Sequence, residues 1–101
     1  LNDSLAGSTA TVVYVEDSPR PKLTIAWAGD SRAVVAGTNG TIKFVTPDHR
    51  PGLASEKARI DRLATDPSNR AVEDKKGQWR TAGLAVSRSL GDASVKEISP
   101  G

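Results

Sequence analysis

Asp30 is the residue of this sequence best placed to do chemistry, because it follows directly on an apolar run that ends in Gly29. Carboxylate oxygens are the ligands that Mg²⁺ and Mn²⁺ prefer in proteins. A carboxylate at the end of a rigid strand is also placed more accurately than one on a flexible loop. The alternative is an aspartate that only caps a turn, with Ser31 and Arg32 as local partners. Residue chemistry alone favours the turn, because a single carboxylate is a poor magnesium site.

Two further groups of polar residues suggest chemistry. Asp48 and His49 are adjacent, as a base beside a metal ligand would be, but we expect a structural turn in which Asp48 caps and His49 hydrogen-bonds to the backbone. Arg80 and Arg88 could each hold a phosphate through paired N–H donors. We also expect at least one of these two arginines to form a buried pair with Glu56 or with an aspartate.

The element that must position Asp30 is the apolar run before it. In residues 23–28, Leu23, Ile25 and Trp27 share one face, and both faces are mostly uncharged. This pattern predicts a central strand that is covered on both sides. The β-branched, uncharged stretch at 8–15 predicts a second buried strand.

Turn residues divide the middle of the chain. Asn39-Gly40 lies between apolar runs at 32–37 and 41–46, which predicts a β-hairpin because both residues tolerate positive φ. Residues rich in proline and glycine then lead to a helix predicted over 53–64. Its apolar stripe is expected to pack on the core, with its charged face in solvent.

The last third of the sequence is less regular. Short strands are predicted at 71–72 and 78–80, after a loop at 68–70. Residues 84–90 fit a strand or a helix equally well, and Gly91 would cap such a helix.

Composition indicates a soluble globular protein of one small domain. The 101 residues are 26% charged and 37% hydrophobic, with a net charge of +2. No apolar run approaches the about 20 residues that cross a bilayer. The lysines and arginines form no tract, so we expect neither membrane nor nucleic-acid partners. The sequence has no cysteine, which excludes disulfides and is compatible with a reducing compartment. We expect an intracellular location, in the cytoplasm or the nucleus.

The two ends of the sequence suggest a piece of a longer domain. The chain has no initiator methionine, starts just ahead of a predicted strand and stops at a predicted turn, residues 99–101. We therefore expect residues 1–101 to form a single partial domain.

Four segments of the sequence, taken in order, are specific enough to indicate a protein family. They are Gly-Ser-Thr-Ala at 7–10, Ala-Gly-Asp-Ser-Arg-Ala-Val at 28–34, Thr-Pro-Asp-His-Arg-Pro at 46–51 with Glu56 and Arg59-Ile60 after it, and Trp79-Arg80 leading to Leu-Ala-Val-Ser-Arg-Ser-Leu-Gly-Asp at 84–92. They span nearly the whole chain. In this order and spacing the sequence resembles the metal-dependent serine/threonine phosphatases of the protein phosphatase 2C family.

The resemblance implies an α+β fold in which two antiparallel sheets stack between outer helices, an α-β-β-α sandwich of which this chain is the central segment. It implies hydrolysis of phosphoserine and phosphothreonine in proteins by a water that Mg²⁺ or Mn²⁺ activates, with two ions about 3.5–4 Å apart. It places Asp30 beside that centre, on an additional and weaker metal ion. Arg80 is the candidate phosphate-binding residue, and no residue of the chain is assigned as catalytic.

The sequence also departs from the family pattern. The family's Asp-Gly-His-Gly-Gly segment, its later Ser-Asp-Gly segment, its C-terminal Asp-Asn pair and its early phosphate-binding arginine have no counterpart here. The stretch from Arg80 to Leu84 is one residue shorter than usual. We therefore expect no turnover by these residues alone. The alternative function is a non-catalytic, phosphatase-like module that binds or regulates a partner.

Overall fold

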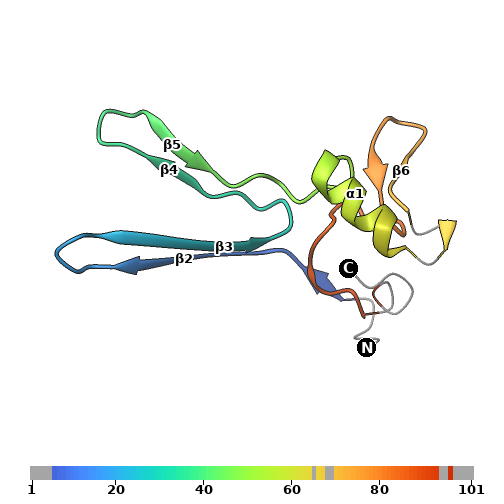
Figure 1. Cartoon of the computed structure of the whole chain (residues 1–101), viewed down its shortest axis with the longest axis horizontal. Helices are drawn as coiled ribbons and strands as arrows, with labels where there is room; N and C mark the ends of the chain where they lie inside the picture. The colour runs from blue at the N-terminus through green and yellow to red at the C-terminus, as the bar shows by residue number, and fades with distance from the viewer. Residues whose placement is uncertain (1–5, 65, 68–69, 94–95, 97–101) are drawn as a thin grey trace.

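The computed structural model describes residues 6–64, 66–67, 70–93 and 96. Two long hairpins extend side by side as arms, and a helix with a short hairpin forms the opposite end (Figure 1). The elements in chain order are β1 (Gly7–Ser8), β2 (Ala10–Glu16), β3 (Lys22–Ala28), β4 (Val34–Ala36), β5 (Ile42–Val45), α1 (Ala54–Leu63), β6 (Val72–Glu73), β7 (Trp79–Arg80) and β8 (Leu90–Gly91). The fold is α+β, and its sheets are small and antiparallel.

The first arm is the hairpin of β2 and β3, which confirms both predicted strands. The two strands pair without interruption from Ala10 opposite Ala28 to Glu16 opposite Lys22. Leu23, Ile25 and Trp27 share one face, as the alternation of the sequence predicts. The arm ends at Ala28, so Asp30 lies where β3 has just finished.

The second arm is the hairpin of β4 and β5, and its turn lies where the sequence predicts, although of Asn39 and Gly40 only Gly40 has a positive φ. Gly40 has a φ of +81°, a conformation that glycine adopts without steric cost. The side-chain oxygen of Asn39 accepts a hydrogen bond of 3.1 Å from the backbone N–H of Thr41. A register shift between Val35 and Ala36 marks a bulge in β4.

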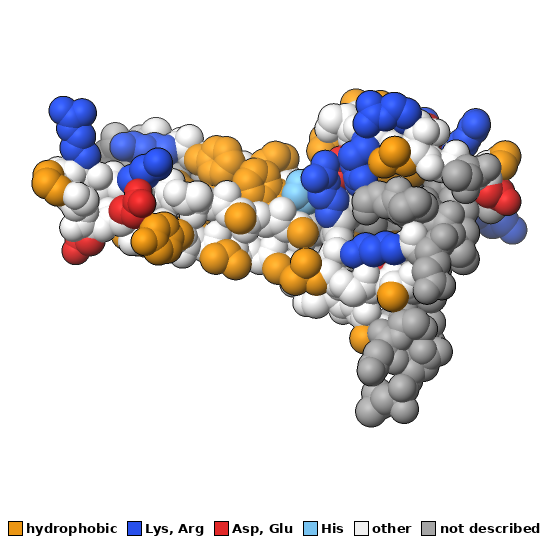
Figure 2. Space-filling model, turned by 60° about the horizontal axis from the view of Figure 1, so that its bottom comes forward, with side chains coloured by type: hydrophobic (Ala, Val, Ile, Leu, Met, Phe, Trp, Pro, Cys, Tyr) orange, Lys and Arg blue, Asp and Glu red, His pale blue; other side chains and the backbone are white. Residues whose placement is uncertain are grey.

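The expectation that the long strands are covered on both sides is wrong for this chain. In the described residues β3 pairs only with β2, and no second layer covers the outer faces of the arms. Val12 and Ile42 are 61% and 62% exposed, and hydrophobic side chains gather along the arms in Figure 2. The apolar pattern of a strand indicates that its faces are buried against other elements. It does not supply those elements, which must come from other residues.

The two arms turn apolar faces toward one another. A groove of about 330 Å³ runs between them, and its lining is made by Leu23, Ile25, Trp27, Val35 and Phe44. The rings of Trp27 and Phe44 meet edge to face, with centroids 6.2 Å apart. This contact is partial, and the described residues do not form the predicted α-β-β-α sandwich.

Helix α1 and the β6–β7 hairpin pack through one shared set of contacts. Ile60 is the buried residue of the predicted apolar stripe, whereas Leu53 and Leu63 remain substantially exposed. The carboxylate of Asp61 accepts a hydrogen bond from Lys57, one turn earlier, and another from the backbone N–H of Ala71. The Lys57 ammonium lies 5.5 Å from the ring centroid of Trp79 on β7. The charged face of the helix therefore holds the short hairpin in place.

Residues 84–90 form neither a long strand nor a helix, so the expectation that Gly91 caps a helix is wrong. Leu84 makes an isolated bridge with Thr81, and β8 pairs with β1. Gly91 has a φ of +81° within that short pair. The predicted turn at 99–101 and part of the predicted loop at 68–70 lie outside the described residues. Within the described part of the chain, no helix has the length and apolar character that crossing a bilayer requires.

We expect the 101-residue chain, when produced alone, to oligomerise or aggregate. Its arms expose apolar side chains on both faces, and such strands join other chains readily. Light scattering across a dilution series measures this directly, and Val12→Lys with Ile42→Lys should raise the monomer fraction. A wild-type monomer that melts in one sharp transition at low micromolar concentration would contradict the expectation.

Candidate functional site

Asp30 lies at the bend between β3 and β4, beside an arginine from another segment. The bend begins at Gly29, whose φ of +107° is rarely accessible to other residues. The Asp30 carboxylate forms an ion pair of 3.2 Å with the Arg50 guanidinium and is partly exposed. Next to it the Ser31 hydroxyl hydrogen-bonds to the Thr9 hydroxyl at 2.6 Å. Contacts from two other segments therefore fix the position of the bend, and the carboxylate stays accessible.

Backbone hydrogen bonds join the Asp30 bend to two distant segments. The N–H of His49 donates to the carbonyl of Gly29, and the N–H of Ser87 donates to the carbonyl of His49, both at 2.9 Å. The three segments lie far apart in the sequence, so only the folded chain brings them together. We call this set, Gly29, His49 and Ser87, the three-segment junction.

His49 has a structural role, as the sequence predicts. Its Nδ1 accepts a hydrogen bond of 3.1 Å from the N–H of Gly29, and its ring stacks on Trp27 with the planes 5° apart. Burial, and then the positive charge of Arg88, lowers the pKa of His49 below its ordinary value. The ring is therefore neutral at pH 7 with its lone pair already engaged, so it is not a free general base.

Glu56 is the centre of the most buried polar cluster. The residue is 3% exposed, on the first turn of α1. Its carboxylate accepts hydrogen bonds from Arg88 at 2.7 and 3.0 Å, from Arg59 at 3.0 Å and from the Ser87 hydroxyl at 2.8 Å. Arg59 also donates to the carbonyl of Ser87. These four residues, the Glu56 cluster, attach the helix to the segment that follows β7. Of the two arginines expected to include a partner of Glu56 or of an aspartate, Arg88 is the one that pairs with Glu56.

The charges in the cluster change the ionisation of Glu56. Burial alone would raise the pKa of this carboxyl, and it is the largest single influence. The hydrogen bonds from Arg88, Arg59 and Ser87 together outweigh it and lower the pKa to about 2. Glu56 is therefore ionised throughout the physiological range and is not available as a proton donor.

The Asp48 carboxylate pairs with two arginine side chains, whereas the sequence predicts that it caps the turn. It accepts two hydrogen bonds from the Arg32 guanidinium, at 3.1 and 2.9 Å, and lies 3.5 Å from the Arg50 guanidinium. The hydrogen bond from Arg32 holds the pKa of Asp48 below its usual range. Arg50 thus lies between two carboxylates, those of Asp30 and Asp48.

Arg80, the predicted phosphate-binding residue, has its donors engaged within its own hairpin and the turn that follows. Its guanidinium donates to Asp74 at 3.2 Å, to the carbonyl of Gly83 at 3.1 Å and to Gln78 at 3.3 Å. The structure does not bring it into contact with Asp30. The two residues predicted as the site therefore lie on separate elements.

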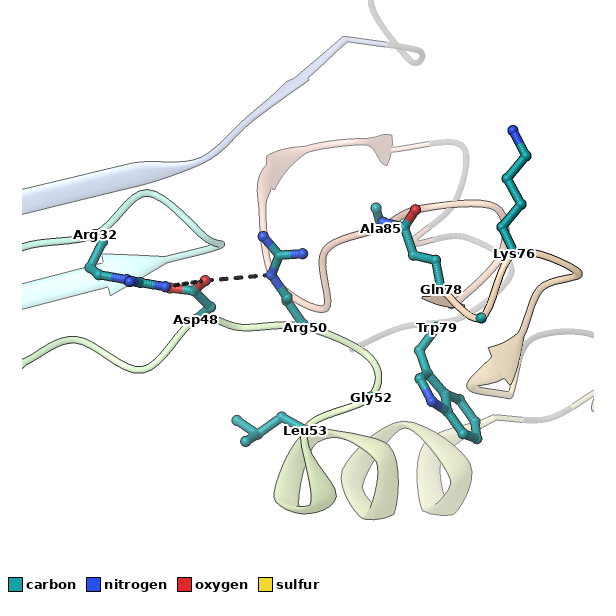
Figure 3. Close-up of a pocket in the computed structure, with 10 residues that line it drawn as sticks. Arg32, Asp48, Arg50, Gly52, Leu53, Lys76, Gln78, Trp79 and Ala85 are labelled. Atoms are coloured by element: carbon teal, nitrogen blue, oxygen red, sulfur yellow. Dashed lines mark hydrogen bonds and ion pairs between the residues drawn. The ribbon is translucent and has the colours of Figure 1, made fainter.

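A pocket of about 660 Å³ lies between the β5–α1 connection and the turn of the β6–β7 hairpin. Figure 3 shows Arg32, Asp48 and Arg50 on one wall, Lys76, Gln78 and Trp79 on the other, and Leu53 at the start of α1. Its remaining lining residues are Gly52, Gly77 and Ala85. Local sequence carries no signal for this pocket, because its two walls come from distant parts of the chain.

Asp30 alone does not make a metal centre. It supplies the oxygen chemistry that Mg²⁺ and Mn²⁺ require. Among the described residues, however, no group of three or more His, Cys, Asp or Glu side chains converges to hold an ion. The described residues therefore do not fit a two-metal centre, and Asp30 fits at most one position of a larger ligand set.

Comparison with known proteins gives one consistent result. The protein phosphatase 2C family model matches residues 2–100. The chain is 43% identical over 95 residues to human "Probable protein phosphatase 1N", 36% over 95 residues to "Protein phosphatase 1L" of Bos taurus, and 34% over 94 residues to "Probable protein phosphatase 2C 14" of Arabidopsis thaliana. These alignments cover 92–94% of the chain but only 19–24% of each relative. No solved structure matches the chain significantly.

Proposed function

The chain belongs to the protein phosphatase 2C family, and we propose that it is the central part of a metal-dependent phosphatase domain that removes phosphate from phosphoserine and phosphothreonine in proteins. The observation that carries the proposal is the extent of the match, from residue 2 to residue 100. Since the chain spans about a fifth of its curated relatives, the activity is proposed for the longer protein.

We propose the α-β-β-α sandwich as the architecture of that longer domain. The support is the pair of arms, whose facing apolar sides enclose the groove around Trp27 and Phe44. Further strands beside the arms and helices over their outer faces would remove the exposed valines and leucines from water. An intracellular location, in the cytoplasm or the nucleus, suits phosphoprotein substrates.

In the proposed reaction, Mg²⁺ or Mn²⁺ bound by the longer protein would supply an activated water and would neutralise charge on the phosphate. Asp30 would contribute one carboxylate to an additional metal position, with the other ligands outside this chain. The junction holds the Asp30 backbone, and Arg50 orients the carboxylate through the 3.2 Å ion pair. Arg80 is proposed to bind the phosphate by donating hydrogen bonds to it, after its contacts within the hairpin are released. No catalytic residue is assigned within the chain.

A non-catalytic role is the second candidate. It is favoured by one observation: the described residues hold no converging set of metal ligands. In such a protein the same fold would present a surface to a partner without turnover.

Hydrolysis of p-nitrophenyl phosphate by the full-length protein, measured against Mn²⁺ concentration, separates the two candidates. We expect metal-dependent turnover, and we expect Asp30→Asn to raise the half-maximal Mn²⁺ concentration about tenfold, the effect of about 1.4 kcal/mol in binding. Asp17→Asn, in the exposed turn of the first arm, is the matched control and should leave the curve unchanged. A full-length protein without turnover at any Mn²⁺ concentration would favour the non-catalytic role.

A further inference from the structure

We propose that the pocket between the β5–α1 connection and the β6–β7 turn binds an anionic group of the phosphoprotein substrate, namely a carboxylate or a second phosphate close to the phosphorylated residue. The inference rests on the proposed function and names a class of substrate for it. It concerns a site separate from Arg80, whose donors are directed elsewhere.

The first argument is charge. Three of the lining residues are cationic, Arg32, Arg50 and Lys76, and one is anionic, Asp48, which leaves the lining with a net charge of +2. Arg32 and Arg50 are both close to Asp48, and Arg50 also pairs with the carboxylate of Asp30, which is not a lining residue. In the part of the chain that the structure describes, the Lys76 ammonium makes no hydrogen bond or ion pair. The net positive charge of the lining favours an oxyanion, which guanidinium groups bind through paired donors.

The second argument is shape. Arg50 extends into the space between the walls, and Lys76 lies on the turn of the opposite wall with its ammonium pointing up and away from Arg50 in this view (Figure 3). Trp79, on the same wall as Gln78, and Leu53 provide apolar surface in the lining. Gly52 approaches the indole so closely that a Cβ at this position would lie 2.7 Å from Trp79 Cδ1. The volume of about 660 Å³ falls within the range of ordinary ligand sites.

The third argument is position. Arg50 contributes to the pocket and also contacts Asp30 at 3.2 Å. A group bound at Arg50 is therefore one side chain away from the candidate metal ligand. This proximity favours a residue that flanks the phosphorylated position over a distant docking motif. Leu53, which precedes α1 without a side-chain cap, also lines the pocket, so the helix N-terminus adds a partial positive charge.

The test compares three phosphopeptides of equal length with the full-length protein. They carry glutamine, glutamate or a second phosphoserine at one flanking position. We expect kcat/KM to be about tenfold higher for the two anionic peptides than for the glutamine peptide at low salt, and the ratio to fall with added salt. Lys76→Gln combined with Arg50→Gln should bring the ratio close to one. Lys75→Gln, an exposed neighbour outside the pocket, should retain it. A preference for the phosphoserine peptide alone would identify phosphate as the ligand.

Trp79 gives a readout that does not depend on turnover. Addition of the glutamate peptide should change the tryptophan fluorescence of the wild-type protein, and Trp79→Phe should abolish the change while Trp27 remains. Equal kcat/KM for all three peptides, or a preference that survives in the double variant, overturns the inference and leaves the phosphatase proposal intact. Absence of turnover on every peptide contradicts the proposed function, and the fluorescence titration then decides whether the pocket binds an anion.

Discussion

Glu56→Gln is expected to lower the free energy of unfolding of the full-length protein by about 3 kcal/mol, because removing one partner of a buried ion cluster leaves the other charges uncompensated. Glu56 is 3% exposed and accepts hydrogen bonds from Arg59, Ser87 and Arg88. The substitution retains the shape of the side chain and removes its negative charge. Urea denaturation at pH 7, fitted to a two-state transition, measures the loss.

The same cluster predicts how stability depends on pH. The pKa of Glu56 in the folded protein is about 2, below its ordinary value of 4.5. A carboxyl whose pKa is lowered by folding stabilises the protein fully above its unfolded pKa, and the stabilisation is lost as pH falls toward the folded pKa. The wild type should therefore lose up to about 3 kcal/mol between about pH 4.5 and pH 2 through this group. Glu56→Gln should lack this part of the acid loss.

Glu73→Gln is the matched control for both measurements. Glu73 is an exposed residue of β6, and a surface substitution of this kind changes stability by about 0.5 kcal/mol or less. Equal unfolding energies for the two variants at pH 7, or parallel pH profiles for the wild type and Glu56→Gln, would show that the cluster does not contribute as described.

Gly29→Ala has the second large expected effect, a loss of about 2–6 kcal/mol in the free energy of unfolding. A Cβ on Gly29 would lie 2.3 Å from Thr9 Cγ2, and the φ of +107° is unfavourable for any L-residue with a side chain. The overlap and the backbone strain each cost about 1–3 kcal/mol. Because Asp30 follows directly, the variant should also lose Mn²⁺-dependent turnover at temperatures where it remains folded.

Gly40→Ala separates the cost of backbone strain from the cost of steric overlap. Gly40 also has a positive φ, +81°, but a Cβ there meets nothing within 4 Å. We expect this control to lose about 1 kcal/mol, from the backbone alone. Thr9→Ser in the Gly29→Ala background should recover part of the difference, because it removes Cγ2 and retains the hydroxyl. Similar losses for the two glycine variants would refute the packing argument.

The features that local sequence determines were predictable. Asn39-Gly40 predicted the second arm, because a tight turn with a glycine at positive φ needs no distant partner. The alternation of residues 23–28 gave β3, and the spacing of Leu53 and Ile60 gave α1 within one residue at each end. The structural role of His49 followed from the turn residues around it.

The features that depend on distant residues were not predictable from local pattern. Residues 84–90 fit two conformations, and their actual path is set by Ser87 and Arg88 contacting His49 and Glu56. The position of Glu56 on the first turn of α1, with Arg59 one turn later, was a signal for the cluster, but it does not name Arg88 as the third member.

The pocket and the cover of the arms were missed for the same reason. The pocket is lined by residues from several separate stretches of the chain, from Arg32 to Ala85, so no local pattern marks its lining. The burial of the long strands was overestimated because their apolar pattern does not say which residues provide the cover.

The three-segment junction has a consequence for the order in which the protein forms on the ribosome. Both arms are complete once residue 45 has been made, and each closes through its own turn. Ser87 and Arg88, which fasten the arms' base to the helix, emerge only after the helix and the short hairpin have been made. During that interval both arms can form while their apolar faces are still uncovered. Slow translation of residues 46–87 would lengthen the period in which chaperones, or neighbouring nascent chains, can bind the arms.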